Sequence, residues 1–133
     1  ILLQNRVLQY ASKHIFVEVL NIISGAAHKA YHGWGAYCTS KAGLLMATKT
    51  AALEITNLGL NAKAWALIPG VIDTGMQEEI RNSNARDFHE LERFVKMKSE
   101  NMLISPAVIA SFITKALTDT AFVNGEVYNI KDF

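Results

Sequence analysis

The chain has 133 residues with thirteen Lys and Arg against twelve Asp and Glu, so its formal net charge of +1 gives no electrostatic reason to expect a nucleic-acid or membrane partner. Half of the residues are hydrophobic and only 19% are charged, which excludes disordered and low-complexity classes and indicates one globular unit over residues 1–133. The single cysteine, Cys38, excludes an internal disulfide, and we expect a reducing, cytoplasmic setting. The four histidines have no cysteine pair at zinc-finger spacing, so we expect no metal site.

The first half of the chain predicts a helix, a strand and a long helix. Apolar residues at helical spacing indicate the end of a helix over residues 1–14. The run over residues 16–23 is rich in β-branched residues and predicts a strand buried on both faces. A loop with exposed histidines follows, and the Ala, Leu, Met and Lys content of residues 36–56 predicts a long helix that Gly59 terminates.

The second half begins with a strand and a short helix. Residues 61–68 predict a second strand, which Pro69 and Gly70 end because proline cannot donate to a β-ladder. The pattern Thr74-x-x-Gln77 has the form of a capping box, which predicts the start of a short helix.

Two helices and a strand complete the chain. Residues 84–98 predict an amphipathic helix that packs through Phe88, Leu91 and Val95. Ser105 before Pro106 predicts the next helix, and residues 125–130 predict a last short strand. The alternation of strands and helices predicts an α/β fold with a parallel sheet and helices on its faces.

Three residues with complementary chemistry fall near one end of this sheet. Ser24 ends the first strand, and Tyr37 and Lys41 are four residues apart in the first turns of the long helix, so that they share one helix face. A tyrosine hydroxyl is a poor proton exchanger at neutral pH, but a lysine cation nearby favours the phenolate form. The pair therefore suits general acid–base chemistry, although a Tyr-x-x-x-Lys pattern alone is weak evidence.

The combination of motifs resembles the short-chain dehydrogenase/reductase family. The matching features are Ser24 at a strand end, Tyr37-x-x-x-Lys41, and the loop from Pro69-Gly70 to Thr74. Within that family the chain is similar to the sepiapterin reductase and benzil reductase group, through residues 33–38, 73–77 and 125–130.

The resemblance implies the carboxyl-terminal half of a Rossmann-type doubly wound sheet, with about three strands, in an NADPH-dependent carbonyl reductase of small ketones, diketones or pterin-like carbonyls. Tyr37 would be the proton donor, Ser24 would hold the carbonyl oxygen, and Lys41 would favour the phenolate form and bind the nicotinamide ribose. Tyr37 and Lys41 would thus also contact the cofactor, together with four residues of the loop after the second strand. These are Pro69, Gly70, Val71 and Thr74.

The resemblance also carries substrate and partner expectations. Trp34 would be a wall of the substrate pocket or a core residue, and Asn129 stands where the sepiapterin enzymes commonly have an Asp that anchors the pterin. A small aromatic or vicinal dicarbonyl compound is therefore favoured over a pterin. The helix over residues 36–56 would mediate a homodimer.

Two departures leave a rival interpretation open. The family's glycine-rich phosphate loop and its catalytic asparagine are absent from these 133 residues. The choice of NADPH over NADH therefore rests on the resemblance alone. The rival interpretation is a truncated remnant without catalysis, in which the long helix serves only as a dimerisation module. A third interpretation is a short-chain enzyme that acts on steroids or acyl thioesters.

Overall fold

The computed structural model describes residues 2–119 and 121–133 and contains one parallel sheet. Its strands are β1 (Val17–Ile22), β2 (Ala62–Ile68) and β3 (Val127–Asn129), in the order β1-β2-β3. β1 pairs with β2 from Val17 opposite Ala62, and β2 pairs with β3 from Ala66 opposite Val127. The predicted α/β fold with three parallel strands is confirmed.

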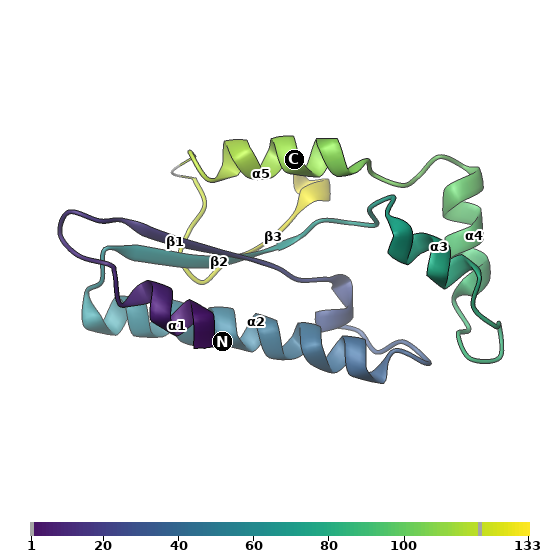
Figure 1. Ribbon diagram of the computed structural model, residues 1–133, viewed down its shortest axis with the longest axis horizontal. Coiled ribbons are helices and arrows are strands. Elements are labelled where there is room, and N and C mark those ends of the chain that lie inside the picture. Colours follow the sequence, from purple (N-terminus) through teal and green to yellow (C-terminus); the bar gives the residue numbers. More distant parts are fainter. Residues whose placement is uncertain (1, 120) are drawn as a thin grey trace.

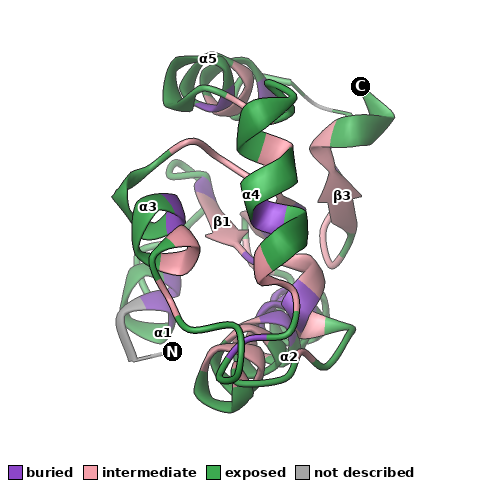
Figure 2. Cartoon of the chain, turned by 90° about the vertical axis from the view of Figure 1, so that its right-hand side faces the viewer, coloured by how far each residue is buried: buried purple, intermediate pink, exposed green. Residues whose placement is uncertain are grey.

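Helices cover both faces of the sheet and one of its ends. α1 (Leu2–Leu8) and α2 (Gly35–Leu58) lie on one face, and α5 (Pro106–Ala116) lies on the other (Figure 1). α3 (Gly75–Arg81) and α4 (Leu91–Ser99) lie beyond the carboxyl ends of the strands. The end-on view of Figure 2 shows that the outer surfaces of α2 and α5 are mostly exposed. No helix in the described residues has the length and apolar character needed to cross a membrane.

The core forms on the two faces of the central strand. Residues 64–67 of β2 are fully buried. Ala64 and Ala66 pack toward α2, whereas Trp65 and Leu67 pack toward α5 and Phe122. Small side chains on the α2 face let the long helix approach the sheet closely, and the large side chains fill the space below α5.

The first strand is less buried than predicted. Of the β1 residues, only Val17 is buried, and the others are half-buried. The expectation of burial on both faces is wrong because β1 pairs with β2 alone in the described chain and forms an edge of the sheet. The helix predicted over residues 1–14 ends at Leu8, and a tight turn joins it to β1 through paired backbone bonds between Ser12 and Ile15.

Most helix boundaries agree with the local sequence signals. Gly59 ends α2 in the left-handed conformation with φ 60°, and the Ser105 side chain accepts a hydrogen bond from the Val108 N–H at the start of α5. The helix predicted over residues 84–98 is shorter, because α4 begins only at Leu91. Its buried residue is Phe94 and not the predicted Val95, which is 48% exposed.

Candidate active site

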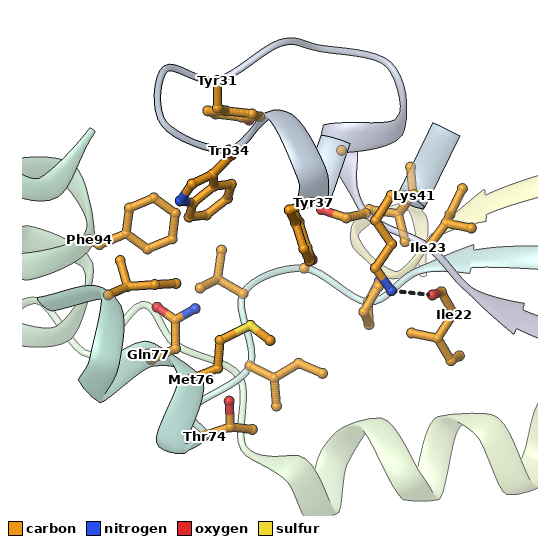
Figure 3. A pocket seen from close by; sticks show the side chains of 18 of the residues that line it. Ile22, Ile23, Tyr31, Trp34, Tyr37, Lys41, Thr74, Met76, Gln77 and Phe94 are labelled. Atoms are coloured by element: carbon orange, nitrogen blue, oxygen red, sulfur yellow. Dashed lines mark hydrogen bonds between the residues drawn. The ribbon is translucent and has the colours of Figure 1, made fainter. Parts of the chain in front are cut away.

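A cavity of about 390 Å³ lies where the carboxyl ends of β1 and β2 meet the start of α2 (Figure 3). The residues that close it from the opposite side belong to α3 and α4. The structure brings all nine residues of the predicted site to this one cavity. They are Ser24, Trp34, Tyr37, Lys41, Pro69, Gly70, Val71, Thr74 and Asn129.

Tyr37 and Lys41 project from the first turns of α2 toward the cavity (Figure 3). The Lys41 Nζ donates a hydrogen bond to the Ile22 carbonyl oxygen at 2.9 Å, which fixes the ammonium group at the end of β1. The same Nζ lies 5.7 Å from the centroid of the Tyr37 ring. No hydrogen bond within the described part of the chain involves the Tyr37 hydroxyl, so this group is free to bond a ligand.

Ser24 lies two residues after the end of β1 and immediately precedes a short 3-10 helix, Gly25–Ala27. Its Oγ accepts a hydrogen bond from the Ala26 N–H at 3.2 Å, which holds the side chain in place. An oxygen that accepts in this way keeps its own proton for a further hydrogen bond. Ser24 lines the cavity, so it is placed to donate that proton to an oxygen bound there.

The loop after β2 forms a second border of the cavity. Gly70 has φ 75°, a left-handed backbone conformation that favours glycine, and a Cβ at this position would lie 2.9 Å from the Ile104 Cδ1. The Val71 carbonyl accepts a hydrogen bond from the Ile104 N–H, whereas no bond among the described residues uses the Val71 N–H. The Thr74 side chain makes no capping bond. A free N–H and a free hydroxyl at the cavity border match the polar carboxamide of a nicotinamide ring.

Four aromatic residues around Trp34 form a wall that we call the aromatic wall. Trp34 stacks on Phe88 with ring centroids 4.6 Å apart and an interplanar angle of 4°. It also lies 5.2 Å from Tyr37, edge to face, 5.4 Å from Tyr31, and 5.6 Å from Phe94. The wall joins the loop before α2 to the segment that contains α4. Trp34 thus packs against other aromatic rings and also lines the cavity, and its contact with a substrate stays a prediction.

Several cavity residues were not predicted from the sequence. Tyr31, Met76, Gln77, Arg93 and Phe94 line the cavity, and no spacing pattern singled out any of them as a cavity residue. A hydrogen bond to Glu90 and a smaller contribution from a hydrogen bond to Tyr31 raise the pKa of the Arg93 guanidinium, which keeps it protonated.

The Asn129 side chain borders the cavity and forms one hydrogen bond within the protein. Its Oδ1 accepts a hydrogen bond from the Lys131 N–H at 3.1 Å, which leaves the amide nitrogen as a donor. Among the described residues, no three His, Cys, Asp or Glu side chains lie close enough together to hold a metal ion.

Comparison with known proteins agrees with this geometry. A family model described as short chain dehydrogenase matches residues 1–85. The chain belongs to the short-chain dehydrogenase family. The chain is 44% identical over 115 residues to a benzil reductase ((S)-benzoin forming) from Bacillus cereus, a match that covers 86% of this chain and 46% of the relative.

The chain is also similar to a sepiapterin reductase and to a protein of known crystal structure. The chain is 32% identical over 107 residues to the sepiapterin reductase of Meriones unguiculatus, covering 80% of this chain and 39% of that protein. The crystal structure of the KRED1-Pglu enzyme superposes with a TM-score of 0.74 at 30% identity, over 84% of this chain and 46% of the other. The predicted kinship with benzil and sepiapterin reductases is therefore confirmed. The chain spans less than half the length of each of these relatives.

Proposed function

We propose that this chain is the catalytic half of a nicotinamide-dependent carbonyl reductase. The observation that carries the proposal is the meeting of Ser24, Tyr37 and Lys41 at one cavity, with two hydroxyl protons free to bond an oxygen there. Membership of the short-chain dehydrogenase family and similarity to a benzil reductase support the same reaction class. We call the longer protein, in which this chain would form the carboxyl-terminal half, the full-length enzyme.

The reaction adds one hydride and one proton across a carbonyl bond. The nicotinamide cofactor supplies the hydride to the carbonyl carbon when it is bound. Tyr37 gives its hydroxyl proton to the carbonyl oxygen as the C–O π bond breaks, and Ser24 donates a hydrogen bond to the same oxygen. The Lys41 ammonium group, held by the Ile22 carbonyl, stabilises the negative charge left on the tyrosine oxygen.

The residues present fit the nicotinamide end of such a cofactor. Lys41 has two further donor protons for ribose hydroxyls, because only one is used by Ile22. Val71 and Thr74 offer the free N–H and hydroxyl at the border of the cavity, and Pro69 and Gly70 shape the loop that presents them. Membership of the short-chain dehydrogenase family supports a nicotinamide cofactor, and we propose NADPH on the family resemblance of the sequence alone.

We propose a small aromatic or vicinal dicarbonyl compound as the substrate. The aromatic wall offers a flat apolar surface beside Tyr37, which suits a ring next to the reacting carbonyl. Asn129 is neutral, and its oxygen is occupied by the Lys131 N–H, so it pairs poorly with a pterin that carries positive charge. The name of the Bacillus cereus relative, benzil reductase, points in the same direction.

Tyr37→Phe in the full-length enzyme tests the proposal. Turnover of benzil should fall by roughly 10²-fold to 10⁴-fold, because a positioned proton donor contributes about that much, while NADPH affinity should barely change. Tyr10→Phe is the matched control, since Tyr10 is 72% exposed and is not a lining residue of the cavity. Near-normal turnover of the Tyr37→Phe enzyme would remove Tyr37 from the mechanism.

A second role for the chain, as a dimerisation module, is favoured by the outer surface of α2. Met46, Leu53 and Leu58 are 62%, 60% and 70% exposed, and such large apolar side chains on one helix favour burial by a partner. We propose that α2 packs against α2 of a second copy. Leu53→Lys should dissociate the dimer in analytical ultracentrifugation. Val123→Lys, which changes an equally exposed residue outside α2, should leave the dimer intact.

A further inference from the structure

Gln77 is a buried polar residue whose side-chain oxygen has no hydrogen-bond partner in the described part of the chain. Its side chain is only 6% exposed, and its Oε1 is completely buried without a hydrogen bond. The sequence predicts a capping box between Thr74 and Gln77, but the structure shows no side-chain capping bond at the start of α3. The predicted capping box is therefore wrong, although the helix does start after Thr74. Buried amides are normally hydrogen-bonded, so this exception requires an explanation.

The Gln77 amide lies in the wall of the active-site cavity. Figure 3 shows it on the same side as Trp34 and Phe94, with Tyr37 between it and Lys41. In this view the amide nitrogen is turned toward Tyr37 and the oxygen is turned away. A compound that places one oxygen at Tyr37 and its ring against the aromatic wall would extend past the nitrogen end of this amide.

Arg81 does not pair with the Gln77 amide in this structure. The Arg81 Nη1 is the other buried side-chain atom without a partner among the described residues. Arg81 follows Gln77 by four residues on α3, so the two side chains are neighbours on one helix face. The guanidinium is a donor and the Oε1 is an acceptor, yet no hydrogen bond joins them in this structure. The amide nitrogen, which can only donate, is the end that Figure 3 shows turned toward Tyr37.

We propose that Gln77 is a specificity-determining residue that recognises a vicinal dicarbonyl compound by donating a hydrogen bond from Nε2 to its second oxygen. The inference rests on the proposed reductase function, because it takes the first oxygen to be at Tyr37 and Ser24. A ketone without the second oxygen fills the same space but offers the amide protons no acceptor. Such a loss of pairing is how a polar site rejects a close analogue.

The test compares benzil with phenyl benzyl ketone, which has one carbonyl replaced by CH₂. The full-length enzyme is assayed for the kcat/KM of both ketones, and calorimetry gives their Kd values in the presence of the oxidised cofactor. Gln77→Met keeps the length of the side chain and removes its donors. It should reduce the preference for benzil by roughly tenfold to hundredfold, in kcat/KM and in Kd, with little loss on the monoketone. Glu79→Gln on the exposed side of α3 is the control and should change neither ratio.

Thermal unfolding separates recognition from a structural role. Gln77→Met should unfold at the same temperature as the unchanged enzyme or higher, because it replaces an unpaired buried amide by an apolar group. A clear fall in unfolding temperature, or equal losses on both ketones, would overturn the inference. If neither ketone is reduced while Gln77→Met still abolishes the preference for benzil in the Kd values, the recognition stands and the proposed reductase function fails. If both ketones are reduced and the variant leaves the preference intact, the reductase function stands and the role of Gln77 is refuted.

Discussion

The contact that holds the aromatic wall together depends on Gly33. This residue has φ 79°, and a Cβ there would lie well inside the van der Waals contact distance of the Asp87 carbonyl oxygen. Gly33→Ala therefore costs about 1–3 kcal/mol for the left-handed backbone conformation. The loop must also move away from the Asp87 backbone, which breaks the adjacent stack of Trp34 on Phe88 and costs a further ~0.5–1.5 kcal/mol. The two costs add to about 1.5–4.5 kcal/mol, which favours a loop displaced from the Asp87 backbone.

A free-energy cost of this size should weaken substrate binding and leave the chemical step unchanged. In the full-length enzyme, Gly33→Ala should raise the KM for benzil by about tenfold or more and leave kcat within a few-fold, because Tyr37 and Lys41 keep their places on α2. The KM for butane-2,3-dione, which has no ring, should change little. Gly35→Ala is the matched control, since a Cβ at Gly35 meets nothing within 4 Å. Equal effects of the two alanines, or a fall in kcat alone, would refute the reasoning.

Two further predictions concern Lys41 and the isolated chain. Lys41→Met should weaken NADPH binding by about tenfold or more and should also lower turnover. The control Lys49→Met, on the exposed side of α2, should change neither quantity. If the Lys41→Met enzyme keeps its affinity for NADPH, the proposed contact between Lys41 and the ribose is excluded. The 133-residue polypeptide alone should bind NADPH no better than roughly millimolar and should aggregate, because β1 has one unpaired edge and Phe16 beside it is 55% exposed. Size-exclusion chromatography and calorimetric titration check this, and a monodisperse monomer with micromolar affinity would contradict it.

Features set by local chemistry could be predicted from the sequence. Gly59 and Ser105 act at helix ends because a left-handed residue and a hydroxyl cap satisfy backbone groups only a few residues away. Ser24, Tyr37 and Lys41 converge because the carboxyl end of a parallel strand and the start of the next helix lie at the same edge of the sheet. The helix ends depend on near neighbours alone, whereas the convergence of Ser24, Tyr37 and Lys41 was predicted from the order of strand and helix together with the family resemblance.

Features set by contacts between distant segments were predicted wrongly or were missed. The spacing of Phe88, Leu91 and Val95 suits a helix, yet Phe88 lies before α4, because Trp34 stacks on it from a loop more than fifty residues earlier. Likewise, the pattern Thr74-x-x-Gln77 fits a capping box, but Gln77 turns into the cavity instead. A local pattern states what a side chain can do with near neighbours, and tertiary burial decides whether it does so.

The reacting groups and the groups proposed to recognise the substrate lie on different kinds of element. The reacting groups are held by rigid parts of the fold, since Lys41 is bonded to the end of β1 and Tyr37 is fixed one turn earlier in a helix of 24 residues. Two of the groups proposed to recognise the substrate, Gln77 and Phe94, lie on short helices, since α3 and α4 have only 7 and 9 residues. Short elements at the open end of a sheet tolerate sequence change better than the strands and the long helix that carry the core. Replacement of Gln77 or Phe94 can therefore alter which carbonyl compound is accepted while the hydroxyl of Tyr37 and the ammonium group of Lys41 keep their positions.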